Sequence, residues 1–207
     1  MLHHLVSWPR KEADAPHPAL VLLHGRGSHE QDLFGLVPML PKRPVVISVR
    51  APFAMGLGGY YWYELRVGGE SDRTSMDSSL EQLYELVTMV PEQYQVDPAQ
   101  VYLLGFSQGA LMSAHFTLGH PELVAGTVML SGYLREPEQH GSAAGKPFFM
   151  AHGTTDGVLS INLARQARLL LESLGVALDY HEYQMDHQVI EPELDDLAKW
   201  FEKRGLT

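Results

Sequence analysis

Apolar runs of strand length alternate with amphipathic segments of helix length along almost the whole chain. The runs cover residues 19–24, 44–49, 101–106, 124–130, 147–152 and 177–183, and helix candidates lie near 30–40, 76–94, 108–119, 160–174 and 191–204. Most runs are nearly continuously hydrophobic, which is typical of parallel strands covered on both faces. The pattern therefore predicts an α/β fold with a mostly parallel, doubly wound sheet and helices on both faces.

No internal repeat, low-complexity tract or linker divides the sequence, so we expect one domain over residues 1–207. The segment 51–75 is rich in glycine and aromatic residues, which favours a surface loop without a regular element. A loop of that length is often functional.

Capping and turn-forming residues mark the ends of the predicted helices. Ser75 or Asp77 is expected to cap the helix near 76–94. Gly119 and the following proline should end the helix near 108–119, and Gly175 the one near 160–174.

Composition and charge exclude several classes of function. The chain has no cysteine, which excludes a disulfide framework, a thiolate zinc site and a cysteine nucleophile. Its formal net charge of −10 and scattered basic residues argue against nucleic acid as a partner. No apolar run approaches the roughly 20 residues that span a bilayer, and the first residues lack the pattern of a signal peptide. We expect a cytoplasmic protein without a membrane span.

The stretch "LLGFSQGA" at 103–110 places Ser107 between two glycines, where an apolar run ends and a helix-forming segment begins. Gly105 and Gly109 lack the Cβ atoms that would clash at a tight corner between strand and helix, as in the G-x-S-x-G nucleophile elbow. The five-residue pattern alone also fits an ordinary turn, but the strand–turn–helix context favours a catalytic serine.

A serine hydroxyl needs a base to take its proton, and the base needs a third group to orient it. In this architecture the order along the chain is serine, acid, histidine, and ligands bind at the carboxyl ends of the strands. His181 lies inside a strand run, where a packed or surface histidine is expected. His187 lies in the loop between that run and the last helix, so we predict His187 as the base, against the alternative of an exposed loop histidine.

Asp156 is the best candidate for the acid. It follows the run 147–152 in a Gly-flanked loop before a helix, although a capping or turn aspartate would look the same. Asp186 adjoins the histidine, but neighbouring residues rarely point at each other with hydrogen-bonding geometry. We therefore predict a triad of Ser107, Asp156 and His187.

Ester cleavage through a serine also needs donors for the oxyanion of the tetrahedral intermediate. The backbone N–H of Gln108 directly follows the nucleophile at a helix N-terminus. The second donor should come from "HGRG" after the first core run, where the N–H of Arg26 is the natural candidate, although "HG" alone would be a plain turn.

Assembled in order, these motifs resemble the phospholipase/carboxylesterase family of α/β-hydrolases, which includes acyl-protein thioesterases. The matches are "LLHGRG" at 22–27, "YWYEL" at 61–65, "LLGFSQGA" at 103–110, "LSGYL" at 130–134, "HGTTDGV" at 152–158 and "DH" at 186–187. The resemblance implies an α/β-hydrolase fold without a large lid domain, and an esterase with the same triad.

The resemblance also implies that Trp62 flanks the substrate pocket, and we group Tyr61 and Arg26 with it as candidate substrate-binding residues. Packing of the aromatic loop explains Trp62 and Tyr61 equally well. Arg26 stands where family members commonly have a small or apolar residue, and Glu64 where they have aspartate. The guanidinium of Arg26 either favours an anionic acyl group or points to solvent.

The most direct hypothesis is a serine carboxylesterase for soluble esters with acyl chains of about eight carbons or fewer, because an open site without a lid suits them. Alternatives with the same triad are a thioesterase or a small peptidase, and a further alternative is a non-catalytic small-molecule binding protein. The eleven histidines show no H-E-x-x-H or similar ligand spacing, so we expect no metal and no cofactor. A homodimer stays open.

Overall fold

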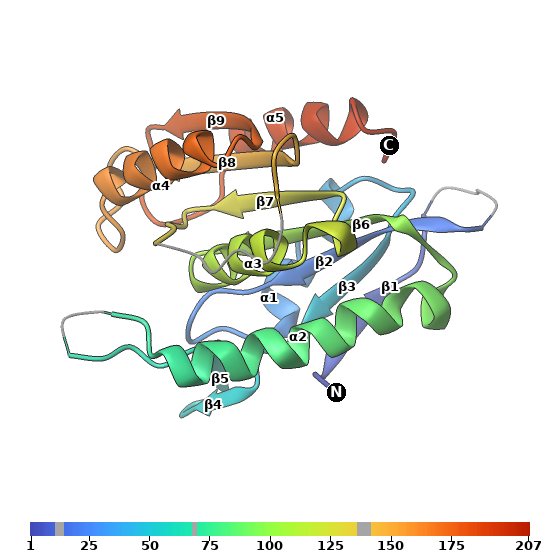
Figure 1. The fold of residues 1–207 in the computed structure, drawn as a ribbon, viewed down its shortest axis with the longest axis horizontal. Coiled ribbons are helices and arrows are strands. Elements are labelled where there is room, and N and C mark those ends of the chain that lie inside the picture. Colours follow the sequence, from blue (N-terminus) through green and yellow to red (C-terminus); the bar gives the residue numbers. More distant parts are fainter. Residues whose placement is uncertain (11–14, 68–69, 136–141) are drawn as a thin grey trace.

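The computed structural model describes residues 1–10, 15–67, 70–135 and 142–207. A seven-stranded sheet in the order β1-β3-β2-β6-β7-β8-β9 forms its centre, and β4 and β5 form a separate hairpin (Figure 1). In the large sheet, β1 is antiparallel to β3 and the other pairs are parallel. The strands are β1 His4–Ser7, β2 His17–Leu23, β3 Val45–Val49, β4 Phe53–Met55, β5 Gly59–Tyr61, β6 Val96–Phe106, β7 Gly126–Leu130, β8 Pro147–Gly153 and β9 Ala177–Tyr183.

Helices cover both faces of this sheet, as the hydrophobic pattern predicts. Successive strand residues point to opposite faces, so Val21 packs in the layer under α2 and α3, whereas Leu22 packs in the layer under α1 and α5. Both side chains are fully buried. The helices are α1 Glu30–Phe34, α2 Arg73–Tyr94, α3 Gln108–Gly119, α4 Ile161–Ser173 and α5 Glu191–Glu202, with short 3-10 turns η1 Val37–Met39 and η2 Pro121–Leu123.

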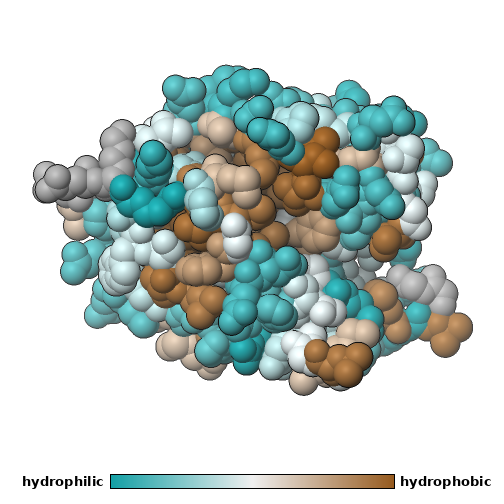
Figure 2. Space-filling model, turned by 180° about the vertical axis from the view of Figure 1, so that it is seen from behind, coloured by the Kyte–Doolittle hydropathy of each residue, from teal (hydrophilic) through white to brown (hydrophobic). Residues whose placement is uncertain are grey.

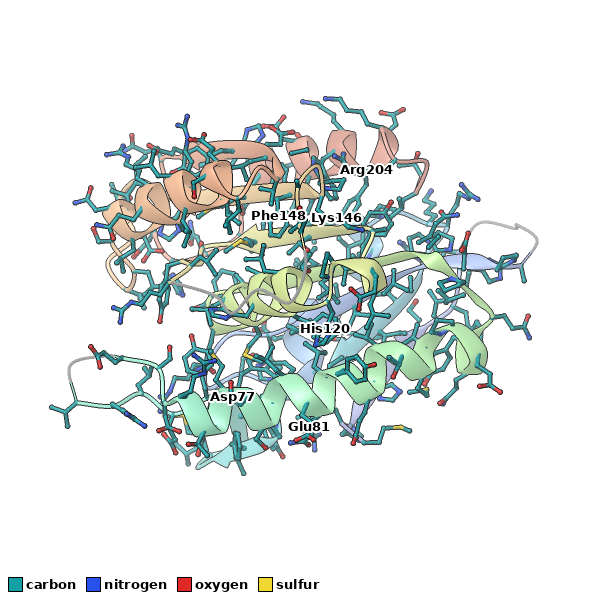
Figure 3. The ribbon with its side chains drawn as sticks, viewed as in Figure 1. Asp77, Glu81, His120, Lys146, Phe148 and Arg204 are labelled. Carbon is teal, nitrogen blue, oxygen red and sulfur yellow. The ribbon has the colours of Figure 1, made fainter. Side chains whose placement is uncertain are left out.

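The side chains show the same division between core and surface (Figure 3). Asp77 and Glu81 lie on the exposed side of α2, whereas Phe148 of β8 is fully buried with residues of α3 and α4. Both ends of the third predicted helix agree with the structure, since α3 runs from Gln108 to Gly119. The predicted end of α4 is also confirmed, because Gly175 follows it with a φ of 73°.

Two helix predictions need correction. The segment predicted as one helix near 30–40 is divided into two elements. The helix α1 ends before Gly35, and the separate turn η1 contains Pro38, which has no N–H to donate. The cap of α2 is Asp72, not Ser75 or Asp77. Its carboxylate accepts the Ser75 N–H at 2.9 Å, so the helix begins at residue 73.

The sequence pattern missed β1 and the β4–β5 hairpin. β1 is short, half-buried and at the sheet edge, where it pairs with β3, so it carries little hydrophobic signal. The hairpin lies inside the segment 51–75, and its turn holds Leu57 and Gly58 at φ 64° and 83°. Glycines between two aromatic-containing runs are a hairpin signal that could have revealed it.

The direction of strand order changes between β2 and β6. From β2 the chain adds β3 on one side, and β6 to β9 then follow on the other. The carboxyl ends of strands at such a switch point leave a crevice that binds ligands in open α/β sheets. The loop after β2 and Ser107 after β6 meet here. Of the helices within the described ranges, none has the length and apolar character that crossing a membrane requires.

Candidate active site

Ser107 occupies a tight corner between β6 and α3. Its φ of 53° lies in the left-handed region, which a non-glycine residue rarely adopts, and its N–H donates to Leu130 O at 2.9 Å. A Cβ at Gly105 would lie 2.1 Å from Gly109 O, and a Cβ at Gly109 would lie 2.0 Å from Leu23 O. Both glycines are therefore required for the close approach of strand and helix that the sequence indicates.

The three residues of the predicted triad form one hydrogen-bonded chain. His187 Nε2 lies 2.9 Å from Ser107 Oγ, and His187 Nδ1 lies 2.7 Å from Asp156 Oδ2. The carboxylate accepts a hydrogen bond from Nδ1–H, which leaves the Nε2 lone pair facing the serine hydroxyl. The His187 side chain is 15% exposed and that of Asp156 is fully buried. The arrangement can move a proton from the hydroxyl to the imidazole.

The carboxylate of Asp156 is held by several donors besides His187. Its Oδ1 accepts the backbone N–H groups of Val158 and Leu159, each at 2.8 Å. The fully buried ring of His152 places Nε2 3.3 Å from Oδ2 and donates to Leu159 O at 2.8 Å. These contacts fix the orientation in which the carboxylate meets the imidazole.

The two competing residues from the sequence have other partners. Asp186 Oδ1 accepts the backbone N–H groups of Gly157 and His187, each at 2.8 Å, and these donors lower the pKa of Asp186. Asp186 thus holds the loop that carries His187 and does not contact its ring. His181 bonds to Asp179 at 2.9 Å, away from Ser107.

The two predicted oxyanion donors are the backbone amides of Arg26, in the loop after β2, and of Gln108, the first residue of α3. Within the described part of the chain, neither Arg26 N–H nor Gln108 N–H donates to another group. His24 fixes the first loop, because its Nδ1 donates to Gly25 O at 2.7 Å and its Nε2 accepts the Ala51 N–H at 3.1 Å. Burial lowers the pKa of His24, so the ring is neutral and suits both bonds.

Trp62 supports both loops and has no exposed surface. Its Nε1 donates to His24 O at 2.9 Å, and its backbone N–H donates to Gln108 Oε1 at 2.7 Å. Gln108 Nε2 donates in turn to Tyr63 O at 2.7 Å. The expectation that Trp62 flanks the substrate is therefore corrected: it lies behind the loops, as the packing alternative holds, because its indole N–H has a buried partner.

A depression of about 350 Å³ opens in front of the serine, lined by residues 25–29 together with Asp32, Phe106, Ser107 and His187. Arg26 lines it, with Nη1 3.5 Å from Met55 Sδ and the guanidinium 5.5 Å from the centre of the Tyr61 ring. Tyr61 itself donates to Glu64 and does not line the depression. In the described ranges no group of three or more His, Cys, Asp or Glu side chains could hold a metal.

Comparison with known proteins identifies the family of the chain. The model of the phospholipase/carboxylesterase family matches residues 9–204. Acyl-protein thioesterase 1 of Yarrowia lipolytica is 25% identical, covering 94% of this chain and 95% of that protein, and the mouse lysophospholipase-like protein 1 is 25% identical over 80% and 70%. The crystal structure of the Bacillus cereus carboxylesterase superposes with a TM-score of 0.86 at 26% identity, covering 98% and 94%. The fold is that of the α/β-hydrolases, the relatives indicate a hydrolase of esters or thioesters, and the chain belongs to the phospholipase/carboxylesterase family.

Proposed function

We propose that the protein is a serine carboxylesterase that cleaves small ester substrates through an acyl-enzyme intermediate. The observation that carries the proposal is the unbroken chain of hydrogen bonds from Ser107 through His187 to Asp156. Family membership supports a hydrolase but does not itself identify the nucleophile.

The proposed first step is attack of Ser107 Oγ on the ester carbonyl carbon while His187 Nε2 takes the hydroxyl proton. The carbonyl oxygen becomes an oxyanion, and the N–H groups of Arg26 and Gln108 would stabilise it. Donors of this kind are typically worth about 3–4 kcal/mol each. The bond to the alcohol oxygen then breaks, and His187 returns its proton to that oxygen. Asp156 stabilises the imidazolium throughout.

In the second step water attacks the acyl carbon, His187 takes its proton, and the acid leaves as Ser107 regains its hydrogen. The depression in front of the serine is open, which supports short-to-medium acyl chains. Arg26 lines the depression, so an anionic acyl group is the finer variant of this proposal. Cytoplasmic location and a homodimer stay predictions.

A thioesterase is the second candidate, because the same serine attack cleaves a thioester and a relative of nearly equal length is an acyl-protein thioesterase. Matched oxygen and sulfur esters of one short acid distinguish the two. A kcat/KM higher for the ester by tenfold or more supports the carboxylesterase, and the reverse order supports the thioesterase.

The decisive experiment is intact-mass analysis after treatment with a fluorophosphonate. We expect a single adduct on the parent protein, none on Ser107→Ala and a full adduct on the control Ser173→Ala, whose serine is exposed on α4. Well-folded parent protein without an adduct would reject the hydrolase and favour the small-molecule binding protein.

A further inference from the structure

The depression at the serine continues into an apolar groove between α1 and α5. The depression shares Asp32 and Phe106 with a second cavity of about 210 Å³. The second cavity shares Leu36 and Val189 with a third of about 650 Å³ that extends along α5 to Ala198. Three neighbouring cavities therefore follow one another from Ser107 across this face of the molecule.

We call this path the α1–α5 groove, and its apolar side chains are Leu33, Leu36, Met39, Phe106, Val189, Ile190, Leu194 and Ala198. Figure 2, which shows the face on which α1 and α5 lie, has a hydrophobic band across its middle between hydrophilic borders. The core does not require all of this surface, since Met39 is 54% exposed. An apolar strip that opens into a polar reaction site is typical of a subsite for an apolar part of a ligand.

The charges along the groove restrict what it can bind. No lysine or arginine lines the second or third cavity. Asp32 lies where the first and second cavities meet, and Glu191 and Asp195 lie at the far end. A phosphate or a free carboxylate in the groove would be repelled by these three carboxylates. The groove therefore suits an uncharged alkyl chain. From residue 190 to residue 198 it follows α5 for about 12 Å at 1.5 Å per residue.

The position of His187 indicates which end of an ester the chain belongs to. His187 Nε2 must give its proton to the departing oxygen, so the alcohol half of the ester lies on the side of the imidazole. The groove begins there: Val189 lies two residues after His187, and the Phe106 ring centre is 4.9 Å from that of the imidazole.

We propose that the α1–α5 groove binds the alkyl chain of the leaving alcohol, so the preferred substrates are esters of linear, uncharged alcohols with a shorter acid. The inference rests on the proposed esterase function. During acylation the bond from Ser107 Oγ to the carbonyl carbon forms and the bond to the alcohol oxygen breaks. His187 transfers its proton to that oxygen, and the neutral alcohol departs along the groove.

The test uses two series of esters, both followed by acid release below the solubility limit of each ester. The first varies the alcohol from ethanol to butanol, hexanol and octanol with acetate as the acid. The second varies the acid over the same lengths with ethanol as the alcohol. Each added methylene of the alcohol should raise kcat/KM by about two- to fourfold, since a buried methylene contributes up to about 0.8 kcal/mol. The acid series should show no such rise.

Two variants place a charge in the groove from opposite walls: Met39→Glu on η1 and Leu194→Glu on α5. Each should lower kcat/KM for octyl acetate at least tenfold and leave that for ethyl acetate within about twofold. The matched control is Leu169→Glu, an exposed leucine on α4 that should change neither. Met39 is the safer site for folding, because its side chain is already more than half exposed.

Each other outcome overturns the proposal in a distinct way. A chain-length effect in the acid series that the two variants abolish would assign the groove to the acyl chain. Absence of any chain-length effect would remove it from substrate binding. A change of oligomeric state in both variants with unchanged chain-length dependence would make it an interface between copies. Parent protein that neither reacts with a fluorophosphonate nor cleaves ethyl acetate would reject the esterase itself.

Discussion

Asp156 and Glu193 are both buried carboxyl groups of the segments that follow β8 and β9, and they differ in the donors that face them. The oxygens of Asp156 accept two backbone N–H groups and the ring N–H of His187. Glu193 Oε2 accepts the N–H of Ile190 at a long 3.4 Å, and Oε1 has no partner among the described residues. One site is built to hold a charge, and the other is not.

The lack of donors affects the titration of Glu193. Burial raises the pKa of Glu193 to about 7, and the single bond from Ile190 lowers it only in part. A perturbed carboxyl near a reaction site is often taken as catalytic. Here the carboxyl with the most donors contacts the imidazole, and the perturbed one, on α5, contacts neither Ser107 nor His187. Donor geometry therefore supports Asp156, and not the carboxyl with the shifted pKa, as the proposed acid of the triad.

The largest expected difference between the two carboxyl groups appears when each is replaced, in separate variants, by its amide. Asp156→Asn should lower kcat by about ten-thousandfold, because an amide that donates to Nδ1 stabilises the wrong tautomer of His187. Glu193→Gln should leave kcat within about twofold. Steady-state hydrolysis of one short ester measures both. A comparable loss in Glu193→Gln would mean that the α5 carboxyl takes part in the reaction.

The second prediction concerns the effect of Glu193 on the stability of the fold. Well below pH 4.5 Glu193 is protonated in both the folded and the unfolded chain, so its titration contributes nothing to the free energy of unfolding. As pH rises from about 4.5 to about 7 the unfolded chain loses the proton first, and the folded state is progressively destabilised.

Glu193→Gln removes this penalty. Its free energy of unfolding should exceed that of the parent by up to about 3 kcal/mol above about pH 8, and the excess should vanish near pH 4. Urea unfolding at several pH values measures it. The exposed Glu81→Gln on α2 is the control and should show no pH-dependent difference. An equal gain at all pH values would show that titration of Glu193 is not the cause.

The sheet and the residues Ser107, Asp156 and His187 could be predicted from the sequence because their signals are local. Buried parallel strands need continuous apolar runs, and the corner at Ser107 needs glycine at fixed positions on either side. The polar residues that follow β8 and β9 can also be recognised in the sequence, because they come directly after apolar runs. Because neighbouring parallel strands end at one edge, Asp156 and His187 meet there although 31 residues separate them.

The environment of Trp62 could not be predicted in the same way. Its bonds join residues 38 and 46 positions apart, and nothing near Trp62 in the sequence specifies those partners. The docking of the β4–β5 hairpin on the loop after β2 also depends on distant residues, since Gly27 N–H donates to Tyr60 O at 2.7 Å. The donors that distinguish Asp156 from Glu193 also come from packing. Side-chain roles set by tertiary contacts are therefore the part that sequence patterns leave open.

The smallest expected effect concerns His152, the second histidine near the Asp156 carboxylate. His152 has no exposed surface, and its Nε2 donates to Leu159 O and lies 3.3 Å from Asp156 Oδ2. His152→Leu removes this donor beside the carboxylate and should lower kcat about tenfold with little change in KM, because His187 loses its fixed partner. His152→Gln keeps an N–H at a similar distance along the side chain and should restore kcat to within about threefold of the parent. Thermal unfolding of both variants separates loss of packing from loss of the N–H donor. If both variants lose equal activity in proportion to their lost stability, His152 only fills space. If glutamine restores activity at equal stability, the N–H of His152 positions Asp156.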